Sequence, residues 1–377
     1  MTEFDFAIAG AGLAGLSLAK SLDSSGKFGR GCLIEPRLTY ERDHIWCFWN
    51  NAPSNLAVPV RKTWNRWKVA YRGRSRVCTS KKYPYTCVFG EDYYQEALNI
   101  IKCSKQLDLF LGQSLTAVAY GDAAVSLTTN RQTIETKLLF DSRPPAVSPT
   151  GFRQEFYGLV VEADRDVFDH TCVTLMDFRD VRVRDGFHFF YVLPFSAREA
   201  LVESAYVGLG GLSQDEHRGH LLAYLHEEFA LDHFVERHKE TGLIPMQPLS
   251  ESSTDARHVP IGTRGGLVRS STGYAFSAIH RFSEQVAGNC QPGEPLEPPA
   301  VLSAKAKLLD TVLLSYLRQK PWEGPLLLSS LFFKVEPSVL VRFITDTASV
   351  ADDAAILAAI PRKMELSAMM AKVSLPA

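Results

Sequence analysis

Hydrophobic positions in the first 35 residues change their spacing around a cluster of glycines. Residues 4–9 alternate between polar and apolar and then run apolar, which predicts a buried strand. A glycine-rich turn at 10–15 follows, residues 16–21 continue with helical spacing, and 31–35 predict a second short strand. Together these segments predict a βαβ-type opening of roughly 30 residues.

The middle of the chain has mostly the pattern of strands. Residues 60–90 alternate between polar and apolar, whereas 93–101 have helical spacing. Residues 108–143 predict a small antiparallel meander that returns to the first domain at 138–141.

The second half begins with strands and ends with helices. Residues 151–207 read as strands with a turn at Ser196 and Ala197, and 212–234 predict a helix after the cap-like Ser213. From Ala304 onward the spacing is mostly helical. The expected helix breaks are the prolines Pro321, Pro325, Pro337 and Pro361.

These patterns predict an α/β fold in which a nucleotide-binding Rossmann-like domain carries an inserted β-sheet substrate domain and C-terminal helices. We expect the nucleotide-binding domain to comprise 1–60, 105–150 and 255–300, the substrate domain 61–104 and 151–254, and a helical region on the substrate and membrane side 301–377.

Composition narrows the class of protein. The 377 residues are 46% hydrophobic and 22% charged, with a net charge of −1, so we expect a large core and no nucleic-acid partner. Seven scattered cysteines without a CxxC pair favour a reduced, cytoplasmic protein over a disulfide framework or a metal site. The start lacks a signal-peptide pattern and no run of about 20 apolar residues occurs, so we expect neither a leader nor a membrane-spanning helix.

One local imbalance of charge interrupts this neutral chain. Between residues 61 and 82 there are nine basic residues and no acidic one, interleaved with Trp64, Trp67 and Tyr71. A solvated hairpin face and a surface that meets anionic lipid both remain open, whereas nucleic-acid binding lacks a recognition motif. The basic residues are Arg61, Lys62, Arg66, Lys68, Arg72, Arg74, Arg76, Lys81 and Lys82.

Gly10, Gly12 and Gly15 form a GxGxxG pattern between the predicted strand and helix, and Glu35 lies about 20 positions further on. Gly10 allows a tight turn, Gly12 lets the backbone approach a pyrophosphate, and Gly15 lets the helix pack closely on the strand. The pattern therefore predicts a dinucleotide site, although glycines that serve only a sharp turn are the alternative.

The start of the helix and the end of the second strand supply the remaining contacts to such a nucleotide. Backbone N–H groups around Leu13 and Ala14, with the positive end of the helix dipole, suit phosphates. Glu35 would accept hydrogen bonds from a ribose diol.

Both NAD and FAD bind to this pattern, and its place near the start of the chain favours FAD. We therefore expect an FAD-binding Rossmann-like domain. No second motif for NAD(P)H is visible, so a reductant would dock transiently or come from another protein. Asp141, in "LLFDSRPP", matches the strand-then-Asp segment that lies under flavins in this architecture.

A second glycine-containing stretch lies in the last part of the expected nucleotide-binding domain. We expect its backbone amides to lie near the flavin ring or the pyrophosphate, and a simple glycine turn is the alternative. The candidate residues are Gly262, Gly266, Thr272, Gly273 and Tyr274.

Several stretches resemble one family from end to end. They are "DHIWCFW" (43–49), "LMDFR" (175–179), "FYVLPFSAREALVESAYV" (190–207), "ETGLIPM" (240–246), "SSTGYAF" (270–276) and "FFKVEPSVLVRFI" (332–344). In order and spacing they resemble the lycopene β-cyclase family of carotenoid biosynthesis. One difference is Ser204, where the family often has a second acid after the essential one.

The resemblance implies a cytoplasmic flavoprotein associated peripherally with the inner membrane. It implies that β-ionone rings are closed on lycopene or a related linear carotene, giving γ-carotene or β-carotene. It also implies that FAD must be reduced, with NAD(P)H as the external reductant, although the reaction has no net redox change.

Ring closure needs an acid in a water-free pocket, and Glu203 is the best candidate. Leu201, Val202, Ala205 and Tyr206 flank it in an otherwise apolar strand. Burial there would raise the pKa of the carboxyl group, as a proton donor near neutral pH requires. From the residues alone an exposed edge-strand carboxylate is equally compatible, and the resemblance favours the catalytic role.

We expect the pocket around the substrate cation to include Asp177, Trp46, Phe48, Trp49 and Tyr206. Asp177 would be a second carboxylate, although an ion pair with the nearby Arg179 is as plausible. The aromatic rings would stabilise a carbocation through their π-faces, and core packing explains them equally well.

Other functions stay open at this point. A redox flavoenzyme, such as a hydroxylase or saturase acting on a lipid, would share the N-terminal motif. A cyclase of a shorter prenyl chain and a non-catalytic prenyl-lipid carrier are further alternatives. The sequence leaves undecided whether Glu203 or the flavin delivers the proton, whether one ring or two are closed, and the oligomeric state.

Overall fold

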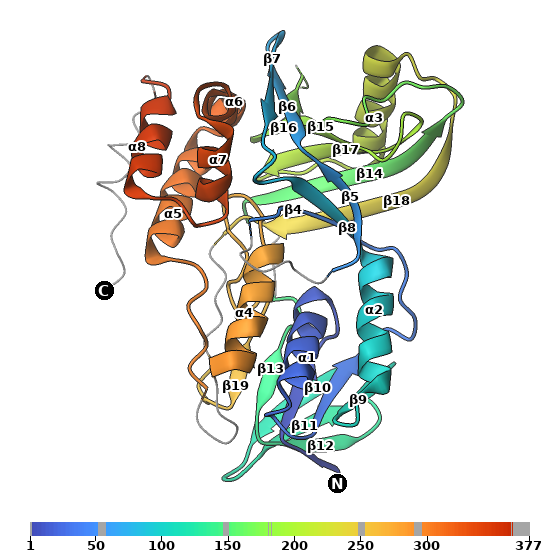
Figure 1. Cartoon of the computed structure of the whole chain (residues 1–377), viewed down its shortest axis with the longest axis vertical. Coiled ribbons are helices and arrows are strands. Elements are labelled where there is room, and N and C mark those ends of the chain that lie inside the picture. Colours follow the sequence, from blue (N-terminus) through green and yellow to red (C-terminus); the bar gives the residue numbers. More distant parts are fainter. Residues whose placement is uncertain are drawn as a thin grey trace.

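A five-stranded parallel sheet forms the lower layer of the computed structural model (Figure 1). The structure describes residues 2–51, 58–145, 151–179, 181, 183–247, 253–289, 296–362 and 364. The strand order is β19-β13-β2-β3-β9, with every neighbouring pair parallel. The strands are β2 (Phe6–Ala9), β3 (Gly31–Glu35), β9 (Leu107–Leu111), β13 (Leu139–Asp141) and β19 (His258–Pro260).

Alternating side chains of this sheet serve two different cores, as expected of a sheet covered on both faces. Phe6 and Ile8 of β2 pack with three helices, whereas Ala7 and Ala9 pack with a small four-stranded sheet. The helices are α1 (Leu13–Ser25), α2 (Gly90–Cys103) and α4 (Phe276–Asn289). The small sheet contains β1 (Thr2–Phe4), β10 (Leu115–Tyr120), β11 (Val125–Thr129) and β12 (Thr133–Thr136). The expected FAD-type Rossmann-like layer and the antiparallel meander are therefore present.

The upper layer is a seven-stranded sheet in the order β18-β14-β17-β16-β15-β6-β7. Helix α3 (Gln214–Phe229) covers one face and begins with a capping box between Ser213 and Glu216, so the cap predicted from the sequence is correct. The strands are β6 (Arg66–Tyr71), β7 (Arg74–Thr79), β14 (Arg153–Ala163), β15 (Val173–Phe178), β16 (Gly186–Pro194), β17 (Glu199–Gly208) and β18 (Phe234–Pro245).

Strand alternation divides this upper sheet into two faces. Ala200 and Val202 of β17 pack beneath α3, whereas Leu201 and Ala205 join the core that includes the C-terminal helices. We call these the α3 face and the cavity face. A three-stranded sheet of β4 (Ile45–Trp49), β8 (Tyr85–Phe89) and β5 (Val60–Trp64) contributes to the same core as the cavity face.

The C-terminal region is helical up to residue 359 (Figure 1). Pro321 and Pro337 begin new helices, but Pro325 lies in the first turn of α6, where proline is tolerated, and does not break it. No helix among the described residues is long and apolar enough to cross a membrane. The elements are α5 (Ala304–Gln319), the 3₁₀ turn η1 (Pro321–Glu323), α6 (Gly324–Lys334), α7 (Pro337–Ile344) and α8 (Val350–Ala359).

Helix α2 belongs by its contacts to the lower layer. Tyr93, Ala97 and Ile101 are buried in the core shared with α1 and the parallel sheet. The sequence boundaries placed this helix in the substrate segment 61–104. The end of the C-terminal segment, residues 363 and 365–377, lies outside the described residues.

Candidate functional site

A cavity of about 1110 Å³ lies between the two layers and extends beneath the C-terminal helices. Typical ligand sites occupy roughly 300–1,000 Å³, so this cavity has room for more than an ordinary small ligand. One part is lined by the glycine turn, Glu35 and Arg37, and the other by apolar side chains of the upper sheet and the C-terminal helices. The first part is suited to a polar, charged ligand and the second part to an apolar one.

The glycine turn is shaped for a phosphate group. Gly10 has a φ of +89°, and a Cβ there would lie 2.6 Å from the hydroxyl of Ser142. A Cβ on Gly15 would lie 2.0 Å from the carbonyl oxygen of Gly10, so only glycine lets helix α1 approach the turn. A Cβ on Gly12 would contact nothing within 4 Å and would occupy the open cradle instead.

The first turn of α1 leaves its N–H groups available to a ligand. Gly12 makes no side-chain cap, and the first turn has no acidic residue. Leu13 and Ala14 line the cavity next to Gly10 and Gly12. A pyrophosphate fits this donor set, because the orphan N–H groups and the helix dipole both favour an anion.

Glu35 lies at the cavity wall, where the sequence pattern placed it. Its carboxylate accepts a 2.6 Å hydrogen bond from the N–H of Ala11 and a 2.8 Å bond from Nε of Arg37. Arg37 also lines the cavity and pairs with Asp43. This arginine, which the motif did not identify, adds a cation beside the expected ribose position.

Asp141 does not line the cavity but is fully buried behind it. Burial alone would raise its pKa, but hydrogen bonds from His258 and Arg143 outweigh it and hold the pKa below its ordinary value. Arg143 and Ser142, the next two residues, do line the cavity. Asp141 therefore orients the residues that face a ligand and does not face it itself.

The second glycine stretch is divided between the cavity wall and a supporting turn. Gly262, Thr272, Gly273 and Tyr274 line the cavity. Gly262 has a φ of +61°, and its Cβ would lie 2.8 Å from that of Ala14.

Gly266 has a φ of +70° and lies outside the cavity lining, so its observed role is that of a turn glycine.

Two buried carboxyl groups meet on the cavity face. Glu203 of β17 and Glu240 of β18 both lie opposite Gly158 of the intervening strand β14. They are hydrogen-bonded to each other and line the cavity. Burial raises the pKa of Glu203, and burial followed by the charge of Glu203 raises that of Glu240 well above its ordinary value. Glu240 lay in the "ETGLIPM" stretch, but the sequence analysis gave it no role.

Hydroxyl and thiol groups surround this carboxyl pair. Tyr191 is the register partner of Glu203 on β16, and its hydroxyl lies 2.9 Å from that of Tyr85. Cys47 also lines the cavity, and its thiol contributes electrostatically to the raised pKa of Tyr191 and of Glu240. A polar cluster therefore lies within an otherwise apolar wall.

Of the expected cation-pocket residues, Trp46 and Trp49 line the cavity but Phe48 does not. Phe48 stacks on Phe276 at a centroid distance of 4.3 Å and is buried in the lower core. The pocket assignment of Phe48 is therefore corrected to core packing.

Asp177 and Tyr206 lie on the α3 face, so the expectation that they line the pocket is also corrected. Tyr206 is three positions from Glu203, and strand alternation turns it to the opposite face. Its hydroxyl donates to the carbonyl of Arg184. Asp177 pairs with Arg179 at 2.9 Å and accepts a 3.1 Å bond from Tyr224 of α3, so the ion-pair alternative describes it.

The apolar part of the cavity lies beneath the C-terminal helices. Its lining includes Phe187 and Phe189 of the upper sheet, Leu317 of α5, and Leu327 and Phe332 of α6. Such a wall suits a long hydrocarbon, because apolar area removed from water contributes roughly 25 cal/mol per Å².

Solved structures share this architecture over nearly the whole chain. A geranylgeranyl bacteriochlorophyll reductase-like protein from Thermoplasma acidophilum matches with a TM-score of 0.64 and 13% identity, covering 99% of this chain and 100% of that one. A flavoprotein/dehydrogenase from Cytophaga hutchinsonii gives 0.61 at 13% identity, with 99% and 100% covered. Halogenase PltM, solved with phloroglucinol and FAD, gives 0.57 at 10% identity, with 98% and 94% covered. These likenesses establish a flavoprotein-type fold.

Sequence comparison identifies the family. Over 170 residues the chain is 29% identical to a lycopene beta-cyclase from Paracoccus sp. (strain N81106 / MBIC 01143). That match spans 42% of this chain and 42% of the relative. The family model described as lycopene cyclase protein matches residues 5–370. The chain therefore belongs to the lycopene cyclase protein family.

Proposed function

We propose that the protein is a lycopene β-cyclase, an intramolecular lyase of the isomerase class, that converts lycopene to γ-carotene or β-carotene with reduced FAD bound. The observation that carries this proposal is one cavity that joins a dinucleotide cradle, a buried carboxyl group at Glu203 and an apolar part. The family match and the lycopene beta-cyclase relative support the same chemistry.

The chain's own residues would divide the work as follows. The turn at Gly10 and Gly12 and the first turn of α1 would hold the FAD pyrophosphate, and Glu35 its ribose. Reduced FAD would supply negative charge in a low-dielectric site, which offsets a developing cation. NAD(P)H would be the external reductant.

Glu203 is placed to handle the proton. Burial favours its protonated form, so it can donate a proton to the terminal C=C bond of the carotene. Trp46 and Trp49 would face the resulting cation, each contributing up to about 2 kcal/mol when water is excluded. The apolar wall keeps water from quenching that cation before a ring proton is lost.

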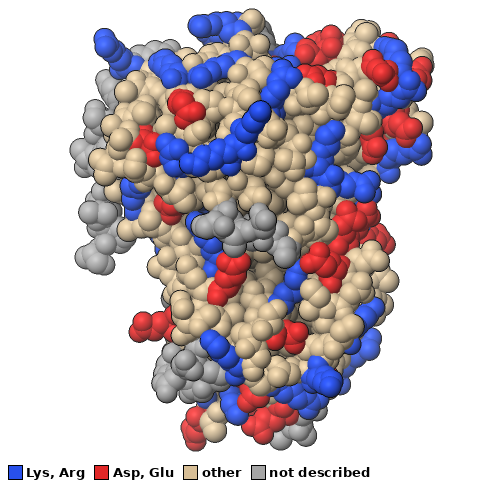
Figure 2. Space-filling view, in the orientation of Figure 1, with Lys and Arg blue, Asp and Glu red and all other residues tan. Residues whose placement is uncertain are grey.

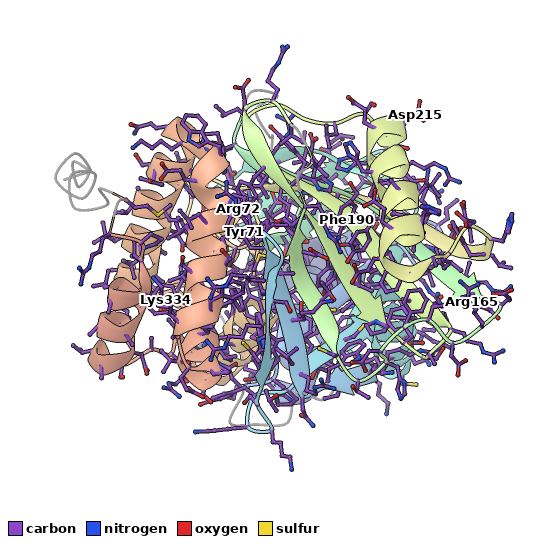
Figure 3. The ribbon with its side chains drawn as sticks, turned by 90° about the horizontal axis from the view of Figure 1, so that it is seen from above. Tyr71, Arg72, Arg165, Phe190, Asp215 and Lys334 are labelled. Atoms are coloured by element: carbon purple, nitrogen blue, oxygen red, sulfur yellow. The ribbon has the colours of Figure 1, made fainter. Side chains whose placement is uncertain are left out.

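Loading from a membrane is part of the proposal, because such a substrate is insoluble in water. Leu357 of α8 lines the cavity and is 57% exposed, so the cavity reaches the surface there. Lys and Arg side chains gather over the upper part of the molecule (Figure 2). Hairpin β6–β7 packs on α6, and Figure 3 shows its tip at Tyr71 and Arg72 near the helix that carries Lys334.

The mass of the product tests the proposal. The chain would be expressed in cells that accumulate lycopene, and the pigments separated and weighed. Ring closure predicts new pigments of unchanged mass, with one or two rings told apart by chromatography. A product that has gained oxygen, or gained or lost hydrogen, would instead identify a redox flavoenzyme.

A further inference from the structure

We propose that Glu240 is a second catalytic residue, which shares one proton with Glu203 so that the two side chains act as a single acid–base unit. The inference rests on the proposed ring closure and deepens it. It stands on the position of Glu240 in the sheet and at the cavity wall.

One register row brings the relevant side chains together across four strands. Tyr191, Glu203, Gly158 and Glu240 are successive partners on β16, β17, β14 and β18. Side chains in one row point to the same face, and both glutamates line the cavity. Both are also buried, at 9% and 6% exposure.

Gly158 allows the two carboxyl groups to meet. Strands on either side of a central strand are roughly 9.5 Å apart, so the glutamate side chains must lean over that strand to touch. A Cβ at position 158 would lie 3.0 Å from Cγ of Glu203 and 3.2 Å from Cγ of Glu240. The space above this glycine is therefore occupied by the two side chains.

The surroundings favour one shared proton. Among the described residues, no Lys, Arg or His side chain forms an ion pair with either glutamate. Two carboxylates buried side by side without a cation repel each other, so the pair retains one proton where isolated carboxyl groups would both ionise. The backbone N–H of Ile45 donates to Glu240 and helps to support the single negative charge.

The proton balance of ring closure fits such a pair. The shared proton forms a new C–H bond as the terminal π-bond breaks, and this leaves two carboxylates facing the substrate cation. A second π-bond then attacks the cation to form the ring C–C bond. Loss of a ring proton to either carboxylate forms the final C=C bond and restores the singly protonated pair, with no co-reactant consumed.

Substitution of each glutamate tests the unit. We expect Glu203→Gln and Glu240→Gln each to lower ring closure at least 100-fold, and the double variant to lose little more than either one. Glu236→Gln is the matched control, because Glu236 lies on the same strand but pairs with Arg218 at the surface. Glu240→Gln with more than a third of the wild-type rate would overturn the proposal.

The pH dependence of the residual activity provides a second test. Removing one carboxylate removes the repulsion that retains the shared proton, so the alkaline limb of the rate profile should move to lower pH in Glu240→Gln. Gly158→Ala keeps both carboxyl groups but wedges a methyl group between them, and the same shift is expected. An unchanged profile in both variants would leave Glu240 a structural residue.

Infrared titration separates failure of the pair from failure of the proposed function. The flavin-loaded wild-type protein should show a carboxylic-acid band that persists to higher pH than in either Glu→Gln variant, whatever the substrate. Absence of this band in the wild type contradicts the shared proton. Presence of the band in a protein that closes no ring would confirm the pair and refute the cyclase proposal.

Discussion

The two faces of the seven-stranded sheet both bury carboxyl groups, but they treat the charge differently. On the α3 face, Asp177 is paired with Arg179 and accepts a bond from Tyr224. On the cavity face, Glu203 and Glu240 are hydrogen-bonded to each other, and among the described residues no basic side chain forms an ion pair with either. The comparison teaches that burial alone does not mark a catalytic acid, because a buried carboxylate with a cation beside it is neutralised and inert.

The α3 face also buries neutral polar groups that serve the fold. His188 and His217 both hydrogen-bond the hydroxyl of Ser204, at 2.7 and 2.8 Å. Ser204 is the position where related sequences were expected to carry a second acid. Strand alternation turns it away from the cavity, so the second cavity carboxyl comes from another strand.

The largest predicted effect comes from blocking the proposed flavin site, which shares the cavity with Glu203 and Glu240. Gly12→Val should fill the phosphate cradle, and the purified protein should lose bound flavin and at least 100-fold in ring closure. The ratio of flavin absorbance to protein concentration measures the loss of bound flavin. Gly219→Val on α3 is the control, since a Cβ there also meets nothing within 4 Å and flavin should be retained.

Acid sensitivity tests the α3 face. Burial lowers the pKa of His188 to about 3, so the unfolded chain binds one more proton than the folded chain between about pH 6.5 and 3. The free energy of unfolding should therefore be highest above pH 6.5 and fall as pH falls, by up to about 1.4 kcal/mol per unit. His188→Gln should flatten this slope in urea titrations, whereas His170→Gln at the surface should not.

The edge of the same sheet gives a smaller, salt-dependent prediction. Reversing Arg72 and Arg74 to Glu should weaken binding to anionic vesicles by about 1 kcal/mol or more per residue. Arg76 should be left intact, because it donates to the carbonyls of Phe332 and Val335 at the end of α6. The control is the double variant Arg165→Glu, Arg198→Glu. If both variants sediment equally with anionic vesicles, the proposal that the β6–β7 hairpin binds the membrane is contradicted.

The smallest effect concerns Tyr206. Its hydroxyl donates to the backbone carbonyl of Arg184 and accepts from the backbone N–H of Gly210. Tyr206→Phe should cost about 1 kcal/mol in the free energy of unfolding and leave ring closure within twofold. A large loss of activity at unchanged stability would contradict the assignment of Tyr206 to the α3 face and would support its role in the substrate pocket.

The sequence was most informative for features that are determined by the spacing of residues close together in the chain. The turn at Gly10 to Gly15, the acidic Glu35 and the cap at Ser213 follow from local rules. In the structure the turn and Glu35 lie at the cavity wall, and Ser213 caps α3. For Glu203 the apolar neighbours left a buried and an exposed carboxylate equally open, the family resemblance favoured the buried acid, and the structure buries it.

The remaining site residues depend on pairing between distant strands. Glu240 reaches Glu203 only because both strands pair with β14 in register at Gly158, which no local pattern encodes. For Asp177 and Tyr206 the error was one of face: the residues were correctly buried but assigned to the wrong side of the sheet. The aromatic residues near Phe48 also separate: Trp46 and Trp49 line the cavity, whereas Phe48 stacks on Phe276 in the core. The sequence does not specify this stacking partner.

The most direct test of the difference between the two faces compares Glu203→Gln with Asp177→Asn, measuring ring closure per bound flavin and stability in urea. We predict that Glu203→Gln loses at least 100-fold in rate with the fold intact. Asp177→Asn should keep its rate within twofold while losing about 1–3 kcal/mol in the free energy of unfolding. Equal loss of rate in both variants, or an active Glu203→Gln protein, would contradict the account.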